Sequence, residues 1–172
     1  YDTVTAAKLI RELGIAGVRD SFYWNGVEKE KGVYTVPEGR EDWITLSYDN
    51  GIEVMYDFIG NGGNALYGLA KLDPTVRGNV IMPDDDVFPG SVDAYCNYVD
   101  WISKTYKGKI KYYELWNEPN LTGFNVNNTT PEKYAELLKR VYEIIKKNDP
   151  EGQVIAFSTA QPALSWVRKA LE

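Results

Sequence analysis

One glutamate, Glu118, follows a short apolar segment and is flanked by residues that suit chemistry on a polar ligand. It stands in the sequence Trp116-Asn117-Glu118-Pro119-Asn120. The alternation of apolar and polar residues before it is typical of a β-strand. Pro119 cannot donate a backbone hydrogen bond, which suits a strand end, and it favours an extended conformation for Glu118. The pattern predicts a carboxylate fixed on stiff backbone at a strand end, beside an amide and an indole.

The period-two rule places five side chains on one face of this expected strand: Ile110, Tyr112, Glu114, Trp116 and Glu118. Hydrolysis of a glycosidic bond needs two carboxyl groups about 5–5.5 Å apart for retention and about 6.5–9.5 Å apart for inversion. Glu114 and Glu118 do not fit, because four extended residues separate them by roughly 13 Å. Asp57 is the best placed partner in this sequence, since it lies near the end of the preceding predicted strand and adjacent strands are about 4.8 Å apart. The alternative is a carboxylate outside this chain.

The composition favours carboxylate chemistry and argues against several other classes of protein. The 172 residues contain no histidine, which removes the usual base of serine and cysteine hydrolases and the commonest metal ligand. The single cysteine, Cys96, excludes an internal disulfide and is expected to be a packed thiol. A net charge of −6 disfavours nucleic acid and membranes as partners. We predict no cofactor and no metal, because the run Asp84-Asp85-Asp86 lacks the spacing of a calcium loop.

Helical and strand patterns alternate along the chain. Helices are predicted at residues 3–13, 42–50, 92–106 and 163–171, and another begins at Pro131 with Thr130 as its cap. Strands are predicted at residues 15–22, 52–59, 110–118 and 153–159, and they are apolar enough for burial on both faces. Residues 25–40 are expected to form a polar connection, residues 60–64 a flexible glycine loop, and residues 65–91 a long loop with one short helix.

This alternation predicts an α/β fold, a parallel sheet with helices outside it. The spacing of the strands, roughly 35 to 55 residues, suits a (β/α)8 or TIM barrel, which typically needs about 250 residues. Four strands cannot close such a barrel. We therefore expect residues 1–172 to form a single partial barrel domain, about half of a barrel, with two open edges. The alternatives are an open sheet and a dimer of half-barrels.

Reactive groups of parallel α/β barrels collect at the carboxyl ends of the strands. Here those ends carry carboxylates, aromatic rings and amides: Arg19, Asp20, Tyr23, Trp24, Asp57, Trp116, Asn117, Glu118, Ser158 and Thr159. The mixture suits a sugar, because aromatic faces stack on C–H surfaces while carboxylates and amides bond hydroxyl groups. Packing is the alternative role for Trp24 and Trp116, and an ion pair with Glu114 is the alternative role for Arg19.

The segment Leu115-Trp116-Asn117-Glu118-Pro119-Asn120 resembles the end of the fourth strand of clan A glycoside hydrolases, most closely family 39 (β-xylosidases and relatives) and similar family 5 enzymes. Gly17-Val18-Arg19, Trp24 and the segment Glu28-Lys29-Glu30-Lys31-Gly32-Val33-Tyr34 are similar to that clan's second strand and the loop after it. Gly51-Ile52-Glu53-Val54 is similar to its third strand. The resemblance covers most of the chain, from the helix before strand two through the helix after strand five, so it implies a partial barrel of about strands two to five.

The resemblance implies a retaining mechanism acting on β-linked sugars, in which Glu118 is the general acid/base and Asn117 bonds the sugar 2-hydroxyl. It also implies that Arg19 orients the nucleophile, a glutamate that the family carries on strand seven, to which nothing in this sequence corresponds. Asp57 then becomes a sugar contact, with Trp24 and Trp116. The implied partners are an oligosaccharide or polysaccharide substrate and the remaining half of the barrel. An extracellular or periplasmic location is also implied, although no signal peptide is visible.

Two other functions fit the same residues. The missing nucleophile is also compatible with a non-catalytic carbohydrate-binding protein on a degenerate hydrolase barrel. An interaction module built on an open α/β sheet would fold but have no affinity for sugars.

Overall fold

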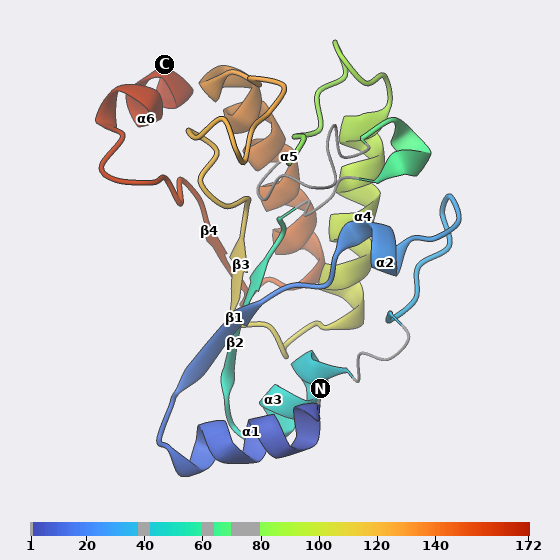
Figure 1. Cartoon of the computed structure of the whole chain (residues 1–172), viewed down its shortest axis with the longest axis vertical. Helices are drawn as coiled ribbons and strands as arrows, with labels where there is room; N and C mark the ends of the chain where they lie inside the picture. Colours follow the sequence, from blue (N-terminus) through green and yellow to red (C-terminus); the bar gives the residue numbers. More distant parts are fainter. Residues whose placement is uncertain (1, 38–41, 60–63, 70–79) are drawn as a thin grey trace.

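The computed structural model describes residues 2–37, 42–59, 64–69 and 80–172 and contains a four-stranded parallel sheet (Figure 1). The strands are β1 (Gly17–Asp20), β2 (Glu53–Asp57), β3 (Tyr112–Glu114) and β4 (Gln153–Ile155), and their spatial order follows the sequence. Each neighbouring pair is parallel. This order is the one that successive β/α units of a barrel produce, so the predicted α/β class is confirmed.

The helices begin and end within a few residues of their predicted positions. They are α1 (Thr3–Glu12), α3 (Trp43–Asp49), α4 (Ser91–Thr105), α5 (Pro131–Asn148) and α6 (Leu164–Leu171). Side-chain caps explain where some of them start: Asp42 accepts a hydrogen bond from the Thr45 amide, and Thr130 accepts one from the Lys133 amide. The short helix α2 (Trp24–Val27) was not predicted, and it runs into the segment, residues 25–40, that was expected to be a polar connection.

Several predicted loops lie partly outside the described residues. The residues outside the description are 60–63 of the expected glycine loop and 70–79 of the long loop. The short helix expected in the long loop is a single 3-10 turn, η1 (Ala65–Tyr67), which is capped by the Asn64 side chain.

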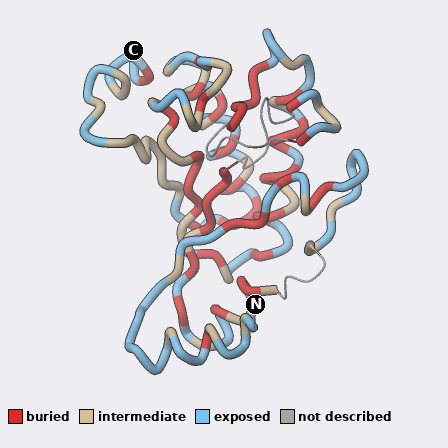
Figure 2. Tube along the Cα trace, viewed as in Figure 1, coloured by how far each residue is buried: buried red, intermediate tan, exposed pale blue. Residues whose placement is uncertain are grey.

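One face of the sheet is packed along its length, whereas on the other face the central strands bury only their last residues, Asp57 and Glu114. This corrects the prediction of strands buried on both faces. The packed side chains come from alternate positions of the two central strands and the residues that follow them: Val54, Tyr56, Phe58, Tyr113 and Leu115. Figure 1 shows α4 and α5 together on this side of the sheet, and Figure 2 shows the buried chain between them and the strands. The other face carries the register row Arg19, Met55 and Tyr112, which is exposed or half-buried.

The uncovered face has a simple cause. Among the described residues no element packs over it, and the outer strands β1 and β4 have mostly exposed or half-buried residues. An apolar strand sequence indicates that both faces of the strand can be buried. Whether a face is buried depends on another element of the fold that covers it. The two open edges expected of a partial barrel are therefore present in the described sheet.

The core between sheet and helices is dominated by aromatic rings. Tyr56 and Tyr98 share a hydrogen bond between their hydroxyl groups at 2.6 Å, and Tyr98 also donates to the Phe22 carbonyl oxygen. Trp24 stacks on Tyr98 with ring centroids 5.8 Å apart. Such pairs combine a large buried area with a fixed orientation. Cys96 is buried nearby as a packed thiol, as predicted, and burial raises its pKa.

A buried carboxylate, Glu28, holds the loop after β1 against η1. Its side chain accepts hydrogen bonds from Trp24 Nε1 at 2.7 Å, from the Tyr67 hydroxyl at 2.6 Å and from the Gly32 amide at 2.8 Å. Only 1% of Glu28 is exposed. Both carboxylate oxygens are therefore surrounded by donors, and a group that itself donates does not fit at either position.

We expect Glu28→Gln to lower the free energy of unfolding by about 1–3 kcal/mol, because the amide –NH2 would face donors at a buried site. Urea unfolding followed by tryptophan fluorescence measures the change. Glu30→Gln is the matched control, since Glu30 is exposed on the same loop and its replacement should have little effect. Equal midpoints for the two variants would contradict the role given to Glu28.

Candidate functional site

The chain turns sharply after β3, at the residues that carry the candidate acid. Trp116 and Glu118 have φ angles of 64° and 48°, in the left-handed region that residues other than glycine seldom adopt. The predictions of a strand continuing to Glu118, and of an extended Glu118, are therefore wrong. The period-two alternation ends at Glu114, so Trp116 and Glu118 do not extend the face on which Glu114 lies. The separation calculated for an extended strand no longer applies.

Bonds to the next strand hold this turn in place. The Leu115 amide donates to the Ile155 carbonyl oxygen at 2.9 Å, and the Glu118 amide donates to the Ser158 carbonyl oxygen at 2.8 Å. The Glu118 carbonyl oxygen accepts from the Leu121 amide at 3.0 Å. Glu118 is half-buried. Its backbone is thus fixed on both sides while part of its surface remains open to solvent.

A charged cluster lies at the carboxyl ends of the three neighbouring strands β1, β2 and β3. Arg19 forms an ion pair with Glu114 at 2.5 Å (Nε to Oε2) and with Asp57 at 2.9 Å (Nη2 to Oδ2). The side chains of Glu114 and Asp57 are 7% and 5% exposed, and that of Arg19 is 43% exposed. The pairing of Arg19 with Glu114, one of the two roles considered for this residue, is confirmed. Two buried carboxylates thus share one cation.

Asn117 joins the same cluster and receives a fixed orientation from it. Arg19 Nη2 donates to Asn117 Oδ1 at 2.8 Å. Because a guanidinium only donates, the oxygen of the amide must face Arg19 and its –NH2 group is left to donate elsewhere. The arrangement presents a hydrogen-bond donor next to Glu118 in the sequence.

Burial and the surrounding charges change the acidity of Asp57. Burial, followed by the negative charges of Glu114 and Asp20, raises the pKa of Asp57 from 3.8 to about 7, and Arg19 opposes the rise. Oδ1 of Asp57 is buried and has no hydrogen-bond partner among the described residues. Asp57 therefore exchanges its proton near neutral pH.

This pKa predicts a pH-dependent stability. Between about pH 4 and about pH 7 the folded chain keeps a proton on Asp57 that the unfolded chain has released, so the free energy of unfolding falls as pH rises. The slope from one such group is roughly 1.4 kcal/mol per pH unit. We expect Asp57→Asn to remove this slope in urea unfolding measured across that range.

Asp49→Asn is the control for this measurement, because Asp49 is exposed at the end of α3. It should retain the pH dependence of the parent chain. If Asp57→Asn also retained it in full, the proton would have to be held by another group.

The two tryptophans predicted as sugar contacts lie in the core. Trp24 is 1% exposed and Trp116 is 0% exposed. Trp24 Nε1 donates to Glu28, and Trp116 Nε1 donates to the Phe124 carbonyl oxygen at 2.6 Å. Their donors and ring faces are occupied within the chain, so the structure gives them the packing role and brings neither to the charged cluster. Trp116 has a left-handed φ of 64°, and its ring packs against that of Tyr95 with centroids 6.1 Å apart.

Ser158 takes part in the cluster more directly than its sequence position indicated. Its hydroxyl group donates to Glu114 Oε1 at 2.5 Å, opposite the oxygen that Arg19 bonds. The available signal was a small polar residue directly after an apolar strand segment. That signal is common, and nothing in the sequence separated Ser158 from Thr159.

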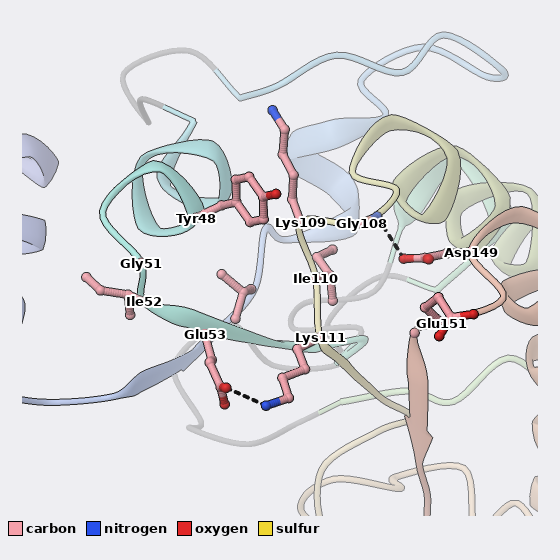
Figure 3. Close-up of a pocket in the computed structure, with 12 residues that line it drawn as sticks. Tyr48, Gly51, Ile52, Glu53, Gly108, Lys109, Ile110, Lys111, Asp149 and Glu151 are labelled. Atoms are coloured by element: carbon pink, nitrogen blue, oxygen red, sulfur yellow. Dashed lines mark hydrogen bonds and ion pairs between the residues drawn. The ribbon is translucent and has the colours of Figure 1, made fainter.

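A pocket of about 360 Å³ lies at the other end of the sheet (Figure 3). It is bordered by the residues that enter β2, β3 and β4, and Figure 3 shows the Lys111–Glu53 ion pair beside it. Asp149 accepts hydrogen bonds there from the Gly108 amide and the Tyr113 hydroxyl. No predicted site residue lines this pocket, and the amino ends of barrel strands serve stability and not catalysis.

Two aspartates of the acidic run at residues 84–86 form ion pairs with a lysine of α5. Lys133 Nζ bonds Asp84 at 2.7 Å and Asp86 at 2.6 Å. Within the described residues no group of three or more histidine, cysteine, aspartate or glutamate side chains is arranged to hold a metal ion. In the described part of the chain, no helix is long and apolar enough to cross a membrane.

Several solved structures similar to this chain are glycoside hydrolases. A family 39 glycoside hydrolase from the gut symbiont Bacteroides cellulosilyticus WH2 superposes with a TM-score of 0.66 at 27% identity, over 91% of this chain and 29% of that one. The endoglucanase Cel5A from Thermotoga maritima gives 0.61 at 18% identity, over 96% and 47%. Endo-glycoceramidase II from Rhodococcus sp. gives 0.66 at 18% identity, over 94% and 46%. This chain has the fold of part of a clan A glycoside hydrolase barrel.

The clan resemblance seen in the sequence is therefore matched by the structure. The chain spans between 29% and 47% of the length of these three hydrolases, which agrees with a partial (β/α)8 barrel. No protein-family model and no curated protein matches the chain.

Proposed function

We propose that this chain is the acid/base-bearing part of a retaining glycoside hydrolase that cleaves β-linked sugars. The observation that carries the proposal is the placement of Glu118 directly after Asn117, whose amide is oriented by Arg19 from another strand. The likeness to family 39 and family 5 type barrels supports the same assignment. Sugar complexes of one of the similar structures agree with it, since Cel5A was solved with mannotriose and with cellobiose.

In the proposed reaction Glu118 protonates the bridging oxygen of the glycosidic bond as that bond breaks. A carboxylate from outside this chain attacks the anomeric carbon and forms a covalent glycosyl–enzyme intermediate. Glu118, now a carboxylate, removes a proton from the water that hydrolyses this intermediate. A structure of endo-glycoceramidase II captured as a lactosyl–enzyme intermediate supports a covalent route in a similar barrel.

Asn117 and Arg19 take binding roles in this scheme. The –NH2 group of Asn117 donates to the 2-hydroxyl of the bound sugar, and such a bond strengthens as charge develops in the transition state. Arg19 holds Asn117 and contributes positive charge near the site of the incoming carboxylate. Asp57 acts through Arg19, with which it is paired.

The test is hydrolysis by the full chain that its gene encodes, using a panel of nitrophenyl β-glycosides. Release of nitrophenol from at least one substrate is expected, and proton NMR should show that the first-formed sugar is the β-anomer. An α-anomer formed first would overturn the retaining mechanism.

A second candidate, a non-catalytic carbohydrate-binding protein, is favoured by one observation. Glu114 and Asp57 are both engaged by Arg19, so neither is placed as a free nucleophile. Binding of oligosaccharides by calorimetry, without turnover of any glycoside in the panel, would support this candidate over the first.

A further inference from the structure

The segment that follows β4 holds the segment that follows β3 at several points. The Leu115 amide donates to the Ile155 carbonyl oxygen, and the Glu118 amide donates to the Ser158 carbonyl oxygen at 2.8 Å. The Ser158 hydroxyl group donates to Glu114 Oε1 at 2.5 Å. A single residue, Ser158, thus bonds the backbone of Glu118 with its carbonyl group and the Arg19 partner Glu114 with its side chain.

Tyr134 on α5 fixes both segments from behind. Its hydroxyl group donates to the Leu115 carbonyl oxygen at 3.0 Å and accepts from the Phe157 amide at 3.0 Å. Tyr134 is 0% exposed. The position of Ser158 is therefore set by a buried contact on its amino side and is not that of a free loop.

The two segments share an unusual backbone. Trp116, Glu118 and Phe157 all have φ angles between 48° and 64°. Residues other than glycine hold such angles only where surrounding bonds over-determine them, and clusters of them are typical of functional sites. The bonds made by Ser158 and Tyr134 are among those that hold them.

We propose that Ser158 is a positioning residue for the acid/base Glu118 and for the Arg19–Asn117 pair, and this inference rests on the proposed glycosidase function. The hydroxyl group of Ser158 occupies one carboxylate oxygen of Glu114, so the other oxygen is directed at Arg19 Nε. Arg19 in turn orients the Asn117 amide. Ser158 thereby connects the backbone that carries the acid with the side chains that bind the sugar.

The contact between the Ser158 hydroxyl group and Glu114 is tested with Ser158→Ala and Ser158→Thr in the full chain. Ser158→Ala should lower kcat ten- to hundredfold on the glycoside that the parent hydrolyses, with less than twofold change in KM, because the misplaced groups act in the transition state. Ser158→Thr keeps a hydroxyl group and should recover most of the loss. Ser165→Ala is the control, since Ser165 is exposed on α6. An unchanged kcat in Ser158→Ala, or a loss that Ser158→Thr does not recover, would overturn the inference.

A second readout does not depend on turnover. The Arg19 Nε–H signal in a proton–nitrogen NMR spectrum reports its bond to Glu114, and Ser158→Ala should shift and broaden it while Ser158→Thr and Ser165→Ala leave it in place. If the parent hydrolyses no glycoside, the proposed function fails and this signal still decides the role of Ser158. An Arg19 signal that is the same in Ser158→Ala and in the parent would overturn the inference.

Discussion

Glu118→Gln is expected to lower kcat by about 10²–10⁴-fold on glycosides with poor leaving groups, the size of effect typical of a lost general acid/base. Glutamine keeps the shape of the side chain but cannot donate a proton to the bridging oxygen or accept one from water. The backbone bonds that fix residue 118, to Ser158 and Leu121, do not involve the side chain and should persist. Initial rates on an alkyl glycoside or an oligosaccharide measure the loss.

The leaving group provides an internal check on this result. A nitrophenolate leaves without full protonation, so cleavage of the first bond should suffer less with nitrophenyl substrates than with alkyl ones. Glu136→Gln is the matched control, because Glu136 is exposed on α5. Equal losses on both kinds of substrate, or full activity of Glu118→Gln, would remove the acid/base assignment.

Arg19→Ala is expected to lower kcat/KM by about 10²-fold and to destabilise the fold by about 1–3 kcal/mol. The activity falls because Asn117 loses the donor that orients it, and small misplacements of binding groups are costly. The stability falls because Glu114 and Asp57 are left as buried carboxylates without their cation, although the 43% exposure of Arg19 limits the cost. Steady-state kinetics and urea unfolding measure the two effects separately.

Arg19→Lys separates charge from geometry in the same position. Lysine restores a positive charge, so most of the stability should return. It lacks the planar fork that reaches Glu114, Asp57 and Asn117 together, so the activity should stay low. Arg168→Ala, an exposed substitution on α6, is the control for both variants. Full activity in Arg19→Lys would mean that only the charge matters.

Local sequence signals were sufficient for the regular elements. α5 begins at Pro131 because Thr130 supplies a cap and proline fits the first helical position, and both signals are readable without a structure. The parallel sheet followed from apolar segments alternating with helices. The ion pair between Arg19 and Glu114 could be proposed because both residues lie at strand ends, but it could not be chosen over other partners.

The shape of the site depended on contacts that no local pattern encodes. The left-handed backbone at Trp116 and Glu118 is held by hydrogen bonds such as that from Glu118 to Ser158, forty residues later in the chain. Alternation in the sequence therefore extended the strand too far. The burial of Trp24 depends on rings from η1 and α4 that stack on it. The raised pKa of Asp57 depends first on its burial and then on carboxylates that meet only in the folded sheet. These features are products of tertiary packing.

The shared cation of the Arg19 cluster has a consequence for any further anion that approaches it. With Glu114 and Asp57 both ionised the three side chains sum to one negative charge, and a carboxylate arriving from another part of the barrel would meet net repulsion. A proton on Asp57, whose pKa is about 7, makes the trio electroneutral. The Arg19 guanidinium can then attract the additional carboxylate while its contacts with Glu114 and Asp57 stay in place. Protonation of Asp57 thus removes the net negative charge of the Arg19 cluster.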